Sequence, residues 1–139
     1  MAEPMATNNG ETGLRAVESG WNAAALRWDC AALAALYTED AVFYGGRVGH
    51  SVGRAAIRAY FESYAALFTS VRLALVEQEL RALGPDCWLA QGYAAFAFDM
   101  KDGGSSQAKL RSTLVLVKRA EGWRILQHHF SATPAVPPI

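Results

Sequence analysis

The fold of this chain is decided by the stretch from residue 123 to residue 134, Trp123-Arg-Ile-Leu-Gln-His-His-Phe-Ser-Ala-Thr-Pro134. Two histidines, a glutamine and a serine interrupt a segment that is otherwise apolar and extended. Because side chains alternate along a strand, the two faces carry different sets, Gln127, His129 and Ser131 on one and Leu126, His128 and Phe130 on the other. A polar stripe of this kind is either a wet surface or the wall of a pocket.

The register of the last hairpin decides which side chains of the preceding strand lie beside this stripe. If the turn centres on Glu121, the opposed pairs are Arg119–Trp123, Val117–Ile125, Thr113–His129 and Arg111–Ser131. A shift by one residue would set Arg111 against Phe130, which is a poorer match. The favoured register gathers a polar cluster, defined here as Arg111, Thr113, Gln127, His129 and Ser131, which Tyr93 and Gln91 of the strand before could join.

Outward from this hairpin, periodicity predicts three helices followed by strands. A helix capped by Thr12 runs to Trp28, a second is capped by Asp29, and a third opens at residues 51–53. The expected strands are Ala41–Tyr44, Val71–Leu83 with a bulge near Glu77–Glu79, Cys87–Met100, Leu110–Arg119 and Trp123–Ala132. We therefore expect a disordered leader at residues 1–11, one domain over 12–134 and a proline-rich tail at 135–139.

Helices followed by a long antiparallel meander indicate an α+β fold. The late strands are apolar on both faces: Phe96 and Phe98 lie on one side of their strand, Leu89 and Tyr93 on the other. Helices can cover only one face of such a sheet, so the other needs a partner. A second copy of the sheet is the simplest partner, and we expect a homodimer through the sheet.

Composition excludes several classes of function. The 139 residues carry 13 basic and 13 acidic side chains, so no strong field recruits nucleic acid or an anionic membrane. No apolar run approaches the roughly 20 residues of a membrane helix, and residues 1–11 do not resemble a signal peptide. Cys30 and Cys87 are far apart, which favours free thiols in a reducing cytoplasm, although a disulfide stays open. Since neither zinc-ligand spacing nor a phosphate loop is present, no metal, nucleotide or other cofactor is implied.

The polar cluster could carry acid–base chemistry. Histidine titrates near neutral pH, so His129 is the candidate acid or base, while Arg111 and Tyr93 could polarise a substrate oxygen. In the alternative, His129 is a buried histidine satisfied by Thr113, and Arg111 is a solvated charge at a strand end. His128 is on the apolar side and is expected at the dimer interface, hydrogen-bonded to the other copy. Which of the two histidines faces a cavity stays open.

Three stretches resemble the nuclear transport factor 2-like superfamily: Leu36-Tyr-Thr-Glu-Asp-Ala-Val42, Gly53-Arg-Ala-Ala-Ile-Arg-Ala-Tyr-Phe61, and Trp123-Arg-Ile with His129-Phe-Ser131. The chain is most similar to the SnoaL-like proteins and to the association domain of calcium/calmodulin-dependent protein kinase. The resemblance implies a cystatin-like, cone-shaped, strongly bent sheet wrapped by the three helices. It also implies a cavity at the wide end of the cone and dimerisation through the sheet.

The superfamily includes enzymes and non-catalytic modules, so the fold alone does not decide the function. In ketosteroid isomerases the general-base aspartate lies shortly after an Asp-Ala pair that resembles Asp40-Ala41. Counted along this chain, that position is Gly45, so the resemblance itself argues against steroid isomerisation.

Two functions are therefore expected to compete. The first is a cavity protein that binds a small apolar molecule, with His129, Tyr93 and Arg111 as catalytic residues if it performs cofactor-free acid–base chemistry. Its other ligand-binding candidates are Thr113, Gln127 and Ser131 and the apolar walls Tyr44, Tyr60, Tyr64 and Trp28. The second is a non-catalytic association or binding module. A closed cavity of several hundred Å3 that His129 enters favours the enzyme, and a shallow or filled one favours the module.

Overall fold

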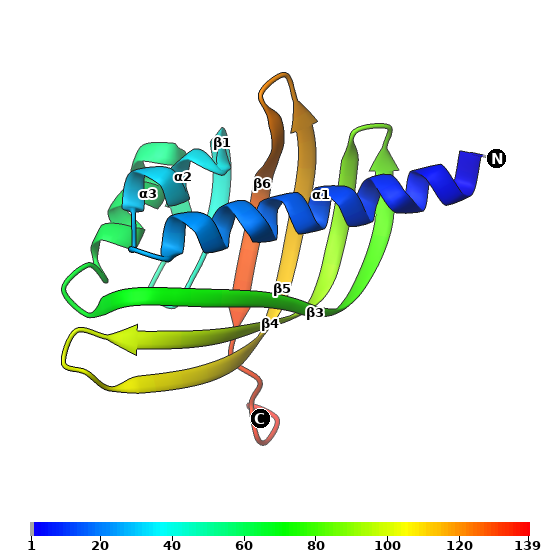
Figure 1. The fold of residues 1–139 in the computed structure, drawn as a ribbon. Helices are drawn as coiled ribbons and strands as arrows, with labels where there is room; N and C mark the ends of the chain where they lie inside the picture. The colour runs from blue at the N-terminus through cyan, green and yellow to red at the C-terminus, as the bar shows by residue number, and fades with distance from the viewer. Residues whose placement is uncertain (1) are drawn as a thin grey trace.

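A strongly bent sheet of six strands forms the body of the molecule (Figure 1). The structure is a computed structural model that describes residues 2–139, with side chains from Asn9 onward. Its elements are α1 (Ala2–Ala25), α2 (Cys30–Ala35), β1 (Tyr37–Tyr44), β2 (Ser51–Val52), α3 (Arg54–Glu62), β3 (Phe68–Gly84), β4 (Cys87–Met100), β5 (Ser105–Arg119) and β6 (Gly122–Ser131). The α+β fold expected from the sequence is confirmed.

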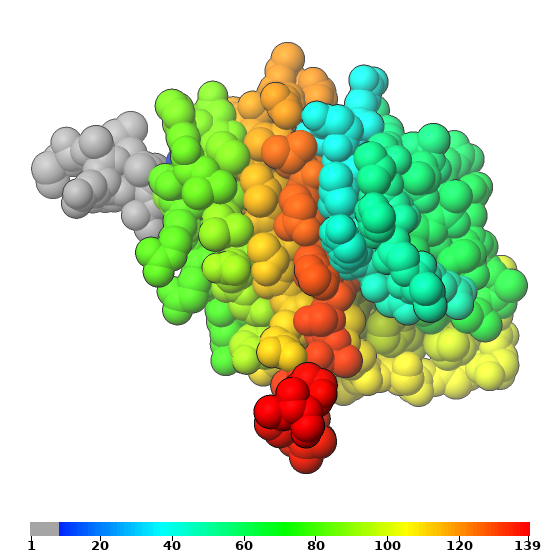
Figure 2. All heavy atoms as spheres, turned by 180° about the vertical axis from the view of Figure 1, so that it is seen from behind, coloured from blue at the N-terminus to red at the C-terminus, as the bar shows by residue number. Residues whose placement is uncertain are grey.

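The strands follow the order β2-β1-β6-β5-β4-β3, and only β1 and β6 run parallel among these neighbours. Helix α1 crosses the concave inner face of the sheet, while α2 and α3 lie at the β1 end (Figure 1). Leu14, Val17, Trp21 and Ala24 recur at helical spacing on α1 and are buried against the strands. The outer face carries no helix (Figure 2).

Side chains of α1 also protect the free edge of β3. The Asn22 side chain accepts a hydrogen bond from the Leu73 amide at 2.7 Å and donates one to the Leu73 carbonyl at 2.8 Å. Glu18 accepts from the Leu75 amide at 2.7 Å, and Arg15 donates to the Leu75 carbonyl at 3.0 Å. An edge strand whose backbone groups are paired in this way cannot offer them to another chain.

Helix α1 begins earlier than the sequence predicts. It starts at Ala2 instead of near Thr12, and Gly10 is buried with its Cα against Trp88, where a Cβ would overlap the indole ring. Of the leader expected at residues 1–11, residues 2–11 belong to α1, and the side chains of residues 1–8 lie outside what the structure describes. The cap predicted for the second helix is confirmed, since Asp29 accepts from the Ala32 amide at 3.0 Å.

Two bulges shape the long strands. The one expected near Glu77–Glu79 is confirmed: the register of β3 shifts between Val76 and Glu79, and Glu77 has a φ of 53°. A second bulge, which the sequence did not predict, shifts the β5–β6 register between Val115 and Leu116. The predicted pairs Thr113–His129 and Arg111–Ser131 are therefore confirmed. The pairs nearer the turn are wrong, because Val117 lies opposite Arg124 and Arg119 lies opposite Gly122.

No helix among the described residues has the length and apolar character that crossing a membrane requires. Both cysteines, Cys30 and Cys87, are free.

Candidate functional site

An aromatic cavity of about 130 Å3 lies between the inner face of the sheet and the helices α1 and α3. Strands β3, β4 and β5 each contribute side chains to its wall. The residues that line this space, called the aromatic cavity below, are Trp21, Trp28, Gly46, Tyr60, Phe61, Tyr64, Phe68, Val71, Phe96, Phe98, Leu110 and Phe130. Among the described residues, no Asp, Glu, Lys, Arg or His side chain lines it.

Local backbone geometry places the tryptophan and phenylalanine rings in this wall. Trp28 lies in the turn after α1 and has a φ of 50°, and its indole N–H donates to the Phe61 carbonyl at 2.9 Å. Its ring then meets Phe61 and Phe68 edge to face, at centroid distances of 5.8 and 5.0 Å. On β4, strand alternation sends Phe96 and Phe98 to the same face, where they stack at 5.6 Å. The rings fix one another's orientations and leave an apolar space between them.

The polar end of the cavity is a pair of phenols on α3 and the turn that follows it. The Gly46 amide donates to the Tyr60 hydroxyl at 2.8 Å, and the Tyr60 hydroxyl donates onward to the Tyr64 hydroxyl at 3.5 Å. Burial is the main cause that raises the pKa of Tyr60, and its hydrogen bond with Tyr64 adds to it. Tyr60 is therefore a neutral phenol at physiological pH.

Arg47 fastens the glycine-rich loop that contains Gly46. Its guanidinium lies 4.2 Å from the centre of the Tyr64 ring and donates to the hydroxyl and carbonyl of Ser63 at 3.2 and 2.9 Å. The loop and α3 are thus joined at the mouth of the cavity.

Gly45 has no room for a side chain, because a Cβ there would overlap the Tyr60 phenol. The position to which the resemblance assigns the isomerase base is therefore occupied by the hydroxyl end of Tyr60. Asp40 lies exposed on β1 and accepts from the Thr38 hydroxyl at 2.9 Å, away from the cavity lining.

The polar cluster predicted from the last strand is brought together, but on the outer face of the sheet. β5–β6 pairing sets Thr113 beside His129, and β4–β5 pairing sets Tyr93 beside Arg111. Arg111, His129 and Ser131 are exposed, while Tyr93, Thr113 and Gln127 are half-buried. None of the six lines the aromatic cavity, so the expectation that His129 enters it is wrong. The physical reason is that His128 and Phe130 occupy the inward positions of β6.

His128 is the inward histidine and is 1% exposed. Its Nδ1 is hydrogen-bonded to the Tyr37 hydroxyl at 2.8 Å, whereas its Nε2 has no hydrogen-bond partner among the described residues. Burial, followed by the nearby His129, lowers the pKa of His128 to about 3. The expectation that His128 bonds across a dimer interface is wrong, because the inner face and Tyr37 enclose the ring.

Of the four residues expected as apolar walls of the pocket, three lie at the cavity and one lies on the outer side of the sheet. Trp28, Tyr60 and Tyr64 line the aromatic cavity. Tyr44 is 40% exposed on the outer side, where it stacks on His50 at a centroid distance of 5.0 Å and contacts the tilted ring of His129 at 5.2 Å. The phenylalanines were missed as site residues, although their shared face was noted; the signal was the concentration of large rings on one side of β4.

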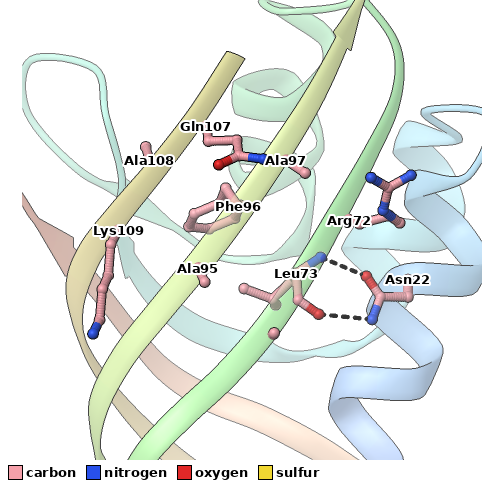
Figure 3. A pocket seen from close by; sticks show the side chains of 10 residues that line it. Asn22, Arg72, Leu73, Ala95, Phe96, Ala97, Gln107, Ala108 and Lys109 are labelled. Atoms are coloured by element: carbon pink, nitrogen blue, oxygen red, sulfur yellow. Dashed lines mark hydrogen bonds between the residues drawn. The ribbon is translucent and has the colours of Figure 1, made fainter. Parts of the chain in front are cut away.

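Two other hollows are open to solvent. A groove of about 580 Å3 lies along β3, β4 and β5, where Ala74, Ala95 and Ala97 leave space between longer side chains such as Arg72 and Lys109 (Figure 3). A charged depression of about 690 Å3 between β1 and the β5–β6 turn contains three arginines and three carboxylates. Neither encloses a ligand, so the aromatic cavity is the candidate ligand site.

The chain matches the family described as the SnoaL-like domain over residues 14–136. Among curated proteins, none matches the sequence. A Xanthomonas campestris protein provisionally named a calcium/calmodulin dependent protein kinase II association domain has a similar structure, with 29% identity, a TM-score of 0.79, and coverage of 88% of this chain and 87% of that one.

Two further structures share the fold at lower identity. A nuclear transport factor 2-like superfamily protein from Salmonella enterica has 20% identity and a TM-score of 0.77, covering 96% of this chain and 97% of that chain. A ketosteroid isomerase-like protein from Erwinia carotovora atroseptica has 21% identity and a TM-score of 0.67, covering 86% and 94%. The chain therefore belongs to the SnoaL-like domain family, and it shares the fold of the nuclear transport factor 2-like protein from Salmonella enterica.

Proposed function

We propose that this protein binds a small, apolar molecule in the aromatic cavity. The observation that carries the proposal is an internal space of about 130 Å3 with nine aromatic residues in its lining. Close packing normally fills a protein interior, so a space of this size at the centre of the inner face calls for an occupant. Apolar cavities of about 150 Å3 remain dry and accept a single aromatic ring.

The lining favours binding over acid–base catalysis by a histidine. His129 lies on the other face of the sheet, and the low pKa of His128 keeps that ring neutral, with Nδ1 engaged by Tyr37. The remaining proton donors are the phenols of Tyr60 and Tyr64. They can hold a polar substituent, but a neutral phenol is a poor base.

Binding can be tested by titrating toluene into the protein while recording intrinsic fluorescence, because Trp21 and Trp28 both line the cavity. A saturable change is expected, and it should disappear in Leu110→Trp, which fills the space. The matched control is His129→Ala on the outer face, which should bind toluene as the wild type does. If His129→Ala abolishes binding while Leu110→Trp retains it, the site is the polar cluster and the proposal is wrong.

A second candidate function, homodimeric association through the outer face, is favoured by a different observation. Val42, Gln127, Val115 and Leu89 lie in one row across β1, β6, β5 and β4 on the outer face and are half-buried. No helix covers that face (Figure 2). Apolar side chains at the centre of an uncovered sheet are typical of an interface. A dimer mass by light scattering at micromolar concentration, lost in Val115→Lys but not in Arg81→Ala, is the expected result. A monomeric wild type would refute it.

We also propose a reducing compartment, in keeping with the cytoplasm expected from the sequence. Both thiols are free, and burial raises the pKa of Cys30, which keeps that thiol protonated. Mass spectrometry after rapid alkylation in cells should find both cysteines reduced.

A further inference from the structure

We propose that the ligand is a neutral molecule with a single aromatic ring and a hydrogen-bond acceptor attached to it, and that the Tyr64 hydroxyl binds this acceptor. The inference rests on the proposed function, since it assigns a ligand class to the same cavity. Three independent features support it: the size of the space, the absence of charge in its lining, and the direction of the hydrogen bonds at its mouth.

Size limits the ligand to one ring. The cavity measures about 130 Å3, below the roughly 300 Å3 at which ordinary ligand pockets begin. Its walls cannot readily move apart, because Trp28 is bonded to the Phe61 carbonyl and packs edge to face against Phe68. A fused two-ring molecule would have to displace these rings, and overpacking of a well-ordered interior is unfavourable.

Charge limits the ligand to a neutral molecule. The lining among the described residues has no ionisable side chain apart from the two phenols. An ion entering the space would lose its hydration with no opposite charge to replace it, which is strongly unfavourable. Arg47 stacks over the Tyr64 ring and is hydrogen-bonded to Ser63, and it is not part of the lining.

The hydrogen bonds at the mouth leave one donor unused. The Tyr60 hydroxyl accepts from the Gly46 amide at 2.8 Å and donates its own proton to the Tyr64 oxygen at 3.5 Å. The Tyr64 hydroxyl, having accepted, has its proton available, and no acceptor for it is present among the described residues. A carbonyl or ether oxygen on a ring held between the aromatic walls can accept this proton. The Gly46–Tyr60–Tyr64 chain thus recognises an acceptor rather than a second donor.

The test uses a matched pair of probes, acetophenone and isopropylbenzene, which have nearly the same shape but differ in the carbonyl. Isothermal titration of the wild-type protein should show acetophenone binding about 3- to 10-fold more tightly, the fold-change of one neutral hydrogen bond. Benzoate and 2-acetylnaphthalene should show no binding at the concentrations that saturate acetophenone.

Two tyrosine variants locate the effect. Tyr64→Phe should bind isopropylbenzene unchanged and lose the preference for acetophenone. Tyr44→Phe makes the same chemical change on the outer side and should retain the preference. Equal affinity for the two probes in the wild type, a preference that survives Tyr64→Phe, or comparable binding of benzoate or 2-acetylnaphthalene would overturn the ligand class while leaving a binding cavity. If neither single-ring probe binds, the proposed function itself fails.

Discussion

The buried histidine on β6 makes a quantitative prediction about acid stability. His128 has a pKa lowered from 6.5 to about 3 in the folded chain, whereas in the unfolded chain it titrates near the ordinary value. Between these two values the unfolded state binds more protons, so stability falls as the pH falls. The loss begins near pH 6.5 and is complete below about pH 3.

The magnitude follows from the width of this interval. One pKa unit corresponds to about 1.4 kcal/mol, so lowering the pH from 7 to 5 should reduce the free energy of unfolding by about 2 kcal/mol through His128 alone. This is a large fraction of the roughly 5–15 kcal/mol that stabilises a domain of ordinary size. The assay is urea denaturation at pH 7 and pH 5, followed by intrinsic fluorescence.

Matched variants isolate the histidine responsible. His128→Asn keeps an acceptor for the Tyr37 hydroxyl but cannot titrate, so its loss between pH 7 and pH 5 should be smaller than that of the wild type by about 2 kcal/mol. His129→Asn, the exposed neighbour, should lose as much stability as the wild type does. If His128→Asn shows the wild-type pH dependence, another group is responsible and the account of His128 is wrong.

Three further predictions concern the loop, the sheet edge and the mouth of the cavity. Gly45→Ala should lower the free energy of unfolding by about 1–3 kcal/mol in urea denaturation, because its Cβ would overlap Tyr60; unchanged stability would mean that the loop moves freely. Asn22→Ala should cost about 1–2 kcal/mol in the same assay, since it leaves two backbone groups of β3 without partners; a neutral result would show that water replaces the amide. Arg47→Ala should speed hydrogen exchange of the Gly46 amide by about 3-fold with little effect on global stability, and exchange at the wild-type rate would show that Arg47 does not fasten the loop.

Periodicity predicted the fold well wherever a segment was long. Alternation over fourteen residues gave the bounds of β4 as Cys87–Met100, and an alternation slip located the bulge at Glu77. The start of α1 was missed because Gly10, a poor helix former, is accepted there by its close contact with Trp88, a contact between distant residues. The β5–β6 register was right from Arg111 to Val115 and wrong from Leu116 to the turn, because the second bulge absorbs one residue.

The site was harder to predict because alternation separates two faces without saying which one is inside. The predicted strand register correctly brought the residues of the polar cluster together. Their interpretation as a pocket wall, however, required the polar face of β6 to point inward. The large rings of Phe96, Phe98 and Phe130 were the better guide, since helices pack on the face that offers the most apolar surface. That criterion makes His128 the inward histidine even before the structure is known.

Gly45 stands where the resemblance places an acidic side chain, and the Tyr60 hydroxyl occupies the space beside it. This arrangement also affects the electrostatics of the cavity. A carboxylate inside this lining would need a charged or hydrogen-bonding partner, and the described lining offers only phenols. With Tyr60 there instead, the polar end consists of phenol hydroxyl groups, and Tyr60 stays neutral because burial raises its pKa despite the opposing charge of Arg47. A neutral donor can bind an acceptor atom without drawing a proton from the ligand. A lining without a carboxylate is therefore consistent with the proposed recognition of a neutral oxygen atom rather than with proton abstraction.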